Sequence, residues 1–145
     1  MRALLQRTTG ARVRVDGQIV GEVGRGLVVL LGVGPEDEAS IADGLGRRVA
    51  ELRIFDDRDG RTNLSLLDVG GEALVISQFT LYADTRRGRR PSWVDAAPGD
   101  VAEPLVDAFC AALRDLGCRV ATGRFGAQMQ VELANNGPVT ISLEL

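Results

Sequence analysis

The sequence contains no histidine and no lysine, and all 17 basic residues are arginine. Without histidine there is no imidazole to act as a general base, a nucleophile or a metal ligand. Without lysine there is neither a Schiff base nor the phosphate-binding lysine of a P-loop. These absences exclude Ser–His–Asp and Cys–His catalysis, most zinc hydrolases and nucleotide hydrolysis of the Walker type. An enzyme of this composition works with carboxylates, hydroxyls, amides and backbone groups, or with groups of its substrate.

Cysteines and long apolar runs are also scarce. Cys110 and Cys118 are too few and wrongly spaced for a zinc site, so we interpret them as small core residues in a reducing compartment. No apolar run approaches the roughly 20 residues of a membrane span. Residues 1–9 have the pattern of a strand, not of a signal peptide. We therefore expect a cytoplasmic protein with no membrane partner, no metal and no cofactor.

The net charge of −3 argues against a general nucleic-acid binder, and we expect no DNA partner. The charge is uneven, however, because four arginines fall within five residues: Arg86, Arg87, Arg89 and Arg90. One interpretation is a solvated loop. The other is a local contact with nucleic-acid phosphates.

The length of 145 residues fits one domain, residues 1–145. Alternating or continuous apolar patterns predict strands at residues 2–8, 11–15, 18–23, 27–33, 53–55, 72–82, 119–122, 127–134 and 139–145. Helical spacing predicts two helices, over residues 36–52 and 100–116, the second with Asp100 as its N-cap. We classify the fold as α/β (mixed α+β), with largely antiparallel and mixed sheets forming a barrel-like core and two main helices.

Two segments allow a functional interpretation beside a structural one. Alternation along residues 77–82 sets Gln78, Thr80 and Tyr82 on one face of a strand, which either meets solvent or holds a small polar ligand. Residues 136–140 carry Gly137-Pro138, which is typical of a turn. The alternative is a segment that presents its backbone to a ligand.

Both segments match a known family. The run Ser77-Gln78-Phe79-Thr80-Leu81-Tyr82-Ala83-Asp84-Thr85-Arg86, followed by Gly88-Arg89-Arg90-Pro91-Ser92, resembles the D-aminoacyl-tRNA deacylase family. So does the C-terminal Asn-x-Gly-Pro-Val-Thr at residues 135–140. Further matches are Met1-Arg2-Ala3 with Gln6-Arg7, Leu52-Arg53-Ile54-Phe55, Asn63-Leu64-Ser65, and Thr122-Gly123-Arg124-Phe125-Gly126-Ala127 with Met129. The resemblance covers essentially the whole chain, and Asn136 departs from an expected Asp.

The resemblance implies a homodimer that hydrolyses D-aminoacyl-tRNA, with two active sites at or near the subunit interface. It implies that Ser77, Gln78, Phe79 and Thr80 of one subunit line the pocket for the aminoacylated 3′-terminal adenosine. It also implies a cis peptide bond at Gly137-Pro138, which the partner inserts into the site. A stiff Gly-Pro backbone suits rejection of L-aminoacyl-tRNA by a clash, and a test of that kind also admits glycyl-tRNA.

The residues themselves limit the mechanism. Thr80 is the obvious nucleophile, but a hydroxyl needs an adjacent base, and the sequence sets none beside it. We therefore expect Thr80 to position groups, with backbone N–H groups near Phe79 and Thr80 stabilising the oxyanion. Two rival functions stay open: a non-catalytic binding module for tRNA or the ribosome, and a hydrolase of another small ester or amide.

Overall fold

The centre of the fold is its first strand, β1 (Arg2–Val15), which pairs with three other strands. The computed structural model describes residues 1–145. In it β1 pairs antiparallel with β2 (Gln18–Val23), β3 (Gly26–Gly32) and β8 (Gln130–Glu144). The sequence predicted two strands in place of β1. A single strand forms because β8 runs beside both halves of it, from Arg2 to Arg14.

Two parallel pairings extend the sheet beyond β3. β6 (Glu72–Ser77) pairs parallel with β3, and β7 (Arg119–Thr122) pairs parallel with β6, giving the order β2-β1-β3-β6-β7 with β8 on β1. The sheet curls until its edges nearly meet: a Cβ added to Gly21 of β2 would lie 2.5 Å from the Thr122 oxygen of β7. This mixed, nearly closed sheet confirms the predicted barrel-like core.

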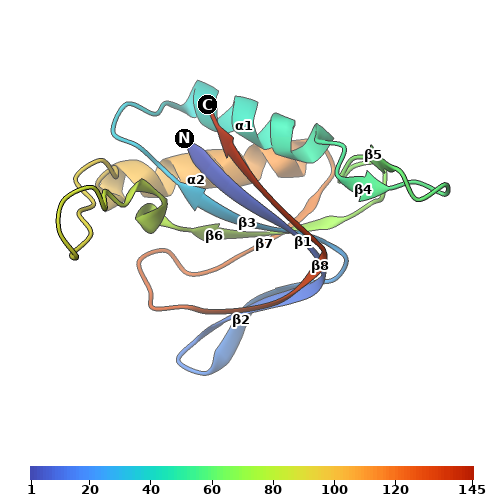
Figure 1. Cartoon of the computed structure of the whole chain (residues 1–145), viewed down its shortest axis with the longest axis horizontal. Coiled ribbons are helices and arrows are strands. Elements are labelled where there is room, and N and C mark those ends of the chain that lie inside the picture. Colours follow the sequence, from blue (N-terminus) through green and yellow to red (C-terminus); the bar gives the residue numbers. More distant parts are fainter.

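The two predicted helices are present and lie together on one side of the sheet (Figure 1). They are α1 (Ala39–Glu51) and α2 (Gly99–Asp115). Between them and the sheet lies a core of 22 buried residues, which includes Cys110 and Cys118, both free thiols as predicted. The predicted cap of α2 was wrong, because Pro98 takes the N-cap position and Asp100 falls in the first turn. Neither helix combines the length and apolarity needed to span a bilayer.

A small hairpin of β4 (Phe55–Asp56) and β5 (Thr62–Leu64) lies apart from the main sheet, at the right of Figure 1. Asp57 shapes its turn, since its Oδ1 accepts the backbone N–H groups of Asp59 and Arg61 at 2.9 and 3.0 Å. The sequence indicated extended structure around residues 53–55 but no strand at residues 62–64.

The long strand predicted over residues 72–82 was wrong. β6 ends at Ser77, and residues Phe79–Tyr82 form a 3₁₀ turn, η1. The ladder stops there because β3, its neighbour, ends at Gly32, and the last bond runs from the Gln78 N–H to the Leu31 oxygen at 2.7 Å. Gln78, Thr80 and Tyr82 therefore do not share the face of a strand.

The turn predicted at residues 135–138 is instead a bulge within one continuous strand, β8. Asn135 pairs with Thr8, and Thr140 pairs with Gln6. Between these two pairs β8 advances by five residues while β1 advances by only two, so β8 has extra residues there. Residues 136–139, which we call the β8 bulge, consequently protrude from the ladder. The Gly137-Pro138 peptide bond within it is cis, and Gly137 has φ +128°.

Candidate active site

A mostly apolar cavity of about 460 Å³ opens where β6 ends. Ser77, Gln78 and Phe79 line it, so three of the four predicted catalytic residues come together there. Eleven of its 15 lining residues are hydrophobic. A cavity of this size and polarity suits a small, flat ligand group that needs few polar contacts.

Two further segments form the walls of this cavity. The first turns of α2 contribute Gly99, Ala102 and Val106, and the segment after β7 contributes Phe125 and Met129. The sequence had assigned none of these five residues a role in the site. The available signal was the match of Thr122–Ala127 and Met129 to the family pattern, because apolar wall residues otherwise look like ordinary core residues.

The turn η1 carries the polar edge of the site. The side chain of Thr80 is exposed, and its Oγ1 accepts a hydrogen bond from Gln78 Nε2. The backbone N–H groups of Phe79 and Thr80 donate to no acceptor in the protein, as is usual for the first groups of a helical turn. Two unpaired donors therefore stand at a residue that lines the cavity and at its neighbour.

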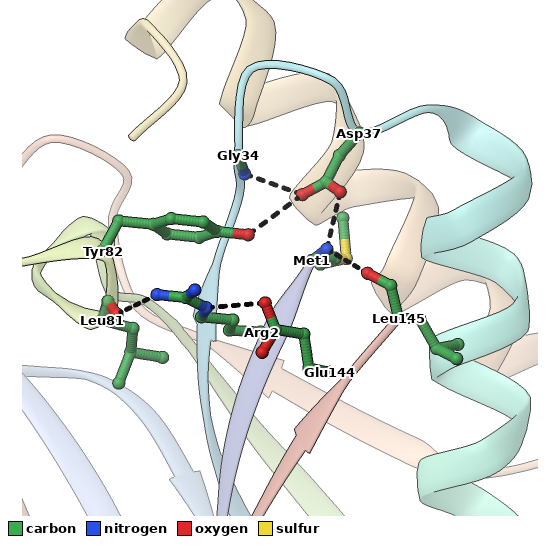
Figure 2. Close-up of polar contacts among 8 residues, drawn as sticks. All are labelled: Met1, Arg2, Gly34, Asp37, Leu81, Tyr82, Glu144 and Leu145. Carbon is green, nitrogen blue, oxygen red and sulfur yellow. Dashed lines mark hydrogen bonds and ion pairs between the residues drawn. The ribbon is translucent and has the colours of Figure 1, made fainter. Parts of the chain in front are cut away.

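Arg2 fastens this turn to the strands behind it (Figure 2). Its Nη1 donates to the Leu81 oxygen at 3.1 Å, and its Nε donates to Glu144 Oε1 at 3.0 Å. The guanidinium also lies 4.3 Å from the centroid of the Tyr82 ring, a favourable cation–π distance. One arginine of β1 thus links η1 to the end of β8.

Tyr82 anchors the C-terminal end of η1. It is 9% exposed, and its hydroxyl points at Asp37, which accepts the Gly34 N–H at 2.7 Å and the Met1 ammonium at 2.6 Å (Figure 2). Burial, with a smaller contribution from the Asp37 charge, raises the pKa of Tyr82 from 10.0 to about 12. Tyr82 is therefore a neutral structural group and not a base for the site.

The segment after Tyr82, residues 84–92, is the arginine loop. It closes through two backbone bonds between Asp84 and Ser92, and Asp84 binds the Arg86 guanidinium through both oxygens. Hydrogen bonds from Arg86 lower the pKa of Asp84 to about 2. The side chains of Arg87, Arg89 and Arg90 are exposed and bind nothing in the chain. All four arginines lie outside the lining of the cavity.

Gly137 and Pro138 also lie outside the cavity, on the exposed β8 bulge. Arg7, only 8% exposed, holds the bulge, donating from Nε to the Asn136 oxygen at 3.0 Å and from Nη1 to the Ile54 oxygen at 2.8 Å. The bulge thus lies beside Arg7 of β1 and beside β4. Gln78, in contrast, bonds to Leu31 of β3, and Leu31 pairs with Ala3 of β1. These two places are four residues, about 13 Å, apart along β1. Within one chain, therefore, the bulge does not complete the cavity.

A second, more polar groove of about 640 Å³ runs between β1, β2 and β8. Four of its five charged side chains are already paired with one another: Arg119 with Glu72 at 2.6 Å, and Arg12 with Glu132. None of the predicted site residues lines it. We therefore assign the site to the apolar cavity, whose rim keeps unpaired donors.

An apolar cavity with unpaired backbone donors at its mouth is typical of enzymes that bind an acyl compound and stabilise a developing oxyanion. The comparison with known families makes this class specific. The chain belongs to the D-Tyr-tRNA(Tyr) deacylase family, whose model matches residues 4–144.

Curated relatives carry the name of this family, and solved structures share the fold. The chain is 60% identical over 144 residues to a D-aminoacyl-tRNA deacylase of Roseiflexus castenholzii, covering 99% of this chain and 92% of that protein. It is 61% identical over 145 residues to one of Beutenbergia cavernae, covering 99% of each. A solved structure described as c-Myc DNA Unwinding Element Binding Protein matches with TM-score 0.93 and 39% identity, over 100% of this chain and 99% of that one. A probable eukaryotic D-amino acid tRNA deacylase, at TM-score 0.86 and 19% identity over 99% of this chain and 98% of that one, shares the fold.

Proposed function

We propose that this chain hydrolyses the ester bond of D-aminoacyl-tRNA and releases the D-amino acid and the tRNA. Its family and its relatives at about 60% identity support this assignment. The observation that carries the chemistry is the pair of unpaired N–H groups on Phe79 and Thr80 beside an apolar cavity. Charged tRNA is used in the cytoplasm, which is where we expect the enzyme to act.

The reaction needs little from side chains, because an aminoacyl ester is already activated. A water oxygen bonds to the ester carbonyl carbon, and the carbonyl oxygen takes up the negative charge. The N–H groups of Phe79 and Thr80 stabilise that oxyanion. The tetrahedral intermediate then collapses, and the ribose oxygen leaves with a proton. The neighbouring 2′-hydroxyl of the terminal ribose helps to activate the water.

Thr80 acts as a positioning group and not as the nucleophile. The one protein group bonded to its hydroxyl is the Gln78 amide, which is no base. Asp84, the nearest carboxylate in sequence, is bound to Arg86, and its pKa of about 2 makes it a poor proton acceptor. No general base therefore stands ready to activate the Thr80 hydroxyl.

Selection against L-aminoacyl-tRNA belongs, in this proposal, to Gly137 and Pro138 of a partner subunit in a homodimer. The distance between the β8 bulge and the cavity of the same chain favours an arrangement shared across subunits. The bulge is exposed yet held by Arg7, so it offers a firm surface against which an L side chain clashes. Glycine carries hydrogen at the tested position, so glycyl-tRNA is a substrate too.

The exposed arginines at positions 86, 87, 89 and 90 hold tRNA phosphates in this proposal, and they do not choose the amino acid. Their support is a concentration of positive charge on a chain of net charge −3, in a loop that follows directly on η1. A contact of this kind acts on every tRNA alike, since phosphates carry no sequence information.

A single-turnover incubation with labelled D-tyrosyl-, L-tyrosyl- and glycyl-tRNA tests the function. We expect rapid release of D-tyrosine and glycine while L-tyrosyl-tRNA persists. Thr80→Val should slow the reaction without abolishing it, and an acyl-enzyme trapped on Thr80 would overturn the water mechanism. Binding of tRNA without turnover would identify a binding module, and turnover of simple esters alone would identify a different hydrolase.

A further inference from the structure

Aromatic side chains are scarce in this chain, and two of the six are exposed. Phe55 and Phe109 are buried in the core, and Tyr82 is 9% exposed. Phe79 is 57% exposed and Trp93 is 39% exposed. These two exposed rings contact each other edge to face, with centroids 5.8 Å apart and an angle of 63° between the ring planes. The chain thus gathers its exposed aromatic surface at one place.

This aromatic pair stands between the cavity and the arginine loop. Phe79 lines the cavity, and Trp93 follows directly on the residues 84–92 that form the loop. Figure 1 shows this part of the chain, in olive and yellow, projecting at one end of the molecule beside the start of α2. A ligand that leaves the cavity past Phe79 therefore meets aromatic rings first and positive charge next.

We propose that Phe79 and Trp93 form a stacking platform for the unpaired base that precedes the terminal adenosine in the 3′ strand of tRNA. The inference rests on the proposed function: when the aminoacylated adenosine occupies the cavity, the preceding nucleotide has to leave by its mouth. Exposed aromatic rings beside a positively charged loop are how proteins bind single-stranded nucleic acid, with bases on the rings and phosphates on the arginines. An edge-to-face pair leaves ring faces open to a third ring.

The test compares two substrates in three proteins. The substrates are D-tyrosyl-tRNA and the minimal ester D-tyrosyl-adenosine, which lacks the preceding nucleotide. The proteins are the wild type, Trp93→Ala and Trp93→Phe. We expect Trp93→Ala to raise KM for D-tyrosyl-tRNA about ten-fold, the loss typical of one stacked base, with kcat little changed. The minimal ester should be cleaved equally well by all three, and Trp93→Phe should restore most of the affinity for the tRNA.

A second measurement uses Trp93 as a reporter, because it is the only tryptophan in the chain. An oligonucleotide ending in CCA should quench its fluorescence, and the same oligonucleotide with an abasic penultimate position should not. Equal losses on both substrates, or a change of oligomeric state in Trp93→Ala, would overturn the proposal in favour of a contact with a second copy of the chain. An unchanged KM for D-tyrosyl-tRNA would also refute it. Failure of the wild type to cleave either ester would instead refute the proposed function, and base-dependent quenching would still report the platform.

Discussion

The β8 bulge and the arginine loop are both exposed and irregular, yet the chain holds them very differently. A nearly buried guanidinium, that of Arg7, binds the backbone of the bulge. The Asn135 side chain also accepts the Val139 N–H at 3.0 Å and donates to Thr140 Oγ1 at 2.9 Å. The loop has only the Asp84–Ser92 bridge and the Asp84–Arg86 pair, both at its ends.

This difference indicates two kinds of task. A segment fixed from the interior presents a constant shape, which is what rejection of a substrate by a clash requires. A loop with three unpaired arginines, at positions 87, 89 and 90, presents charge whose value in binding depends little on the position of each side chain. Variants that loosen the bulge should therefore change stability and selectivity, whereas variants of the arginines in the loop should change neither.

The largest effect is expected from Arg7→Ala. It removes a charged donor from two backbone oxygens, and such bonds are worth about 1.5–3 kcal/mol each, so the free energy of unfolding should fall by about 3 kcal/mol or more. Discrimination between D- and L-tyrosyl-tRNA should fall with it. Denaturant titration and single-turnover assays measure the two effects. Arg12→Ala is the control on the same strand, since the partly exposed pair of Arg12 with Glu132 is worth about 1 kcal/mol. Equal losses in both variants would show that Arg7 has no special hold on the bulge.

A smaller loss of stability is expected from Gly137→Ala, and Gly88→Ala is its matched control in the loop. Both glycines have positive φ, +128° and +72°. A Cβ on Gly137 would lie 2.8 Å from Val139 Cγ2 and 3.1 Å from Arg7 Nη2, whereas nothing lies within 4 Å at Gly88. We expect a loss of about 2 kcal/mol at Gly137 and about 1 kcal/mol at Gly88 in thermal or denaturant unfolding. A larger loss at Gly88 would contradict the assignment of the loop as the freer segment.

Tyr82, the last residue of η1 before the arginine loop, should make the free energy of unfolding depend on pH. Its folded pKa of about 12 exceeds the ordinary 10.0, so the neutral phenol stabilises the fold. That contribution is complete below pH 10 and is lost as the pH rises towards 12, by about 1 kcal/mol at the midpoint. Phenolate absorbance of the single tyrosine reports the titration. Tyr82→Phe should flatten the dependence of stability in this window, and an unchanged alkaline slope in that variant would assign the effect to other groups.

The smallest effect on the fold is expected from neutralising Arg89 and Arg90 together, both to Gln. Stability should change by less than about 0.5 kcal/mol. The slope of log affinity for tRNA against log salt should flatten by about 1.5 units, if each arginine meets one phosphate. The pair Arg47→Gln and Arg48→Gln on α1 removes the same charge from exposed sites elsewhere. If the slope flattens equally in both double variants, the arginines of the loop make no specific contact with tRNA and are only solvated.

Most of the fold follows from patterns that are local in the sequence. The apolar run at residues 27–33 predicted a buried strand, and β3 is buried along nearly its whole length. The helices followed from apolar spacing, and their ends differ by up to three residues. What failed depended on neighbours distant in sequence. Residues 79–82 alternate like a strand, but β3 ends too early to pair with them.

The site shows the same limit more sharply. The family motif allowed Ser77, Gln78 and Phe79 to be predicted as residues of the site. Phe125 and Val106 could not be predicted in this way, because they line the cavity only through the packing of β7 and α2 beside β6. Asn-Asn-Gly-Pro reads locally as a reversal of the chain. It becomes a bulge because Arg7, far away in sequence, supplies a donor to its backbone. Neither the wall of the cavity nor the support of the bulge is encoded in a short stretch of sequence.

The pairing of β1 with β8 also governs how the chain reaches its fold. These strands join Arg2 to Glu144, a separation of 142 residues, and closing a loop of that length costs about 4 kcal/mol of chain entropy. Contacts of such long range slow folding. During synthesis one edge of β1 stays unpaired until the ribosome has made β8, the last strand. The β8 bulge and the clamp of Arg7 on it are then among the final structures to form, so a nascent chain assembles its cavity wall from β6, β7 and α2 before it acquires the segment proposed to guard a neighbour's site.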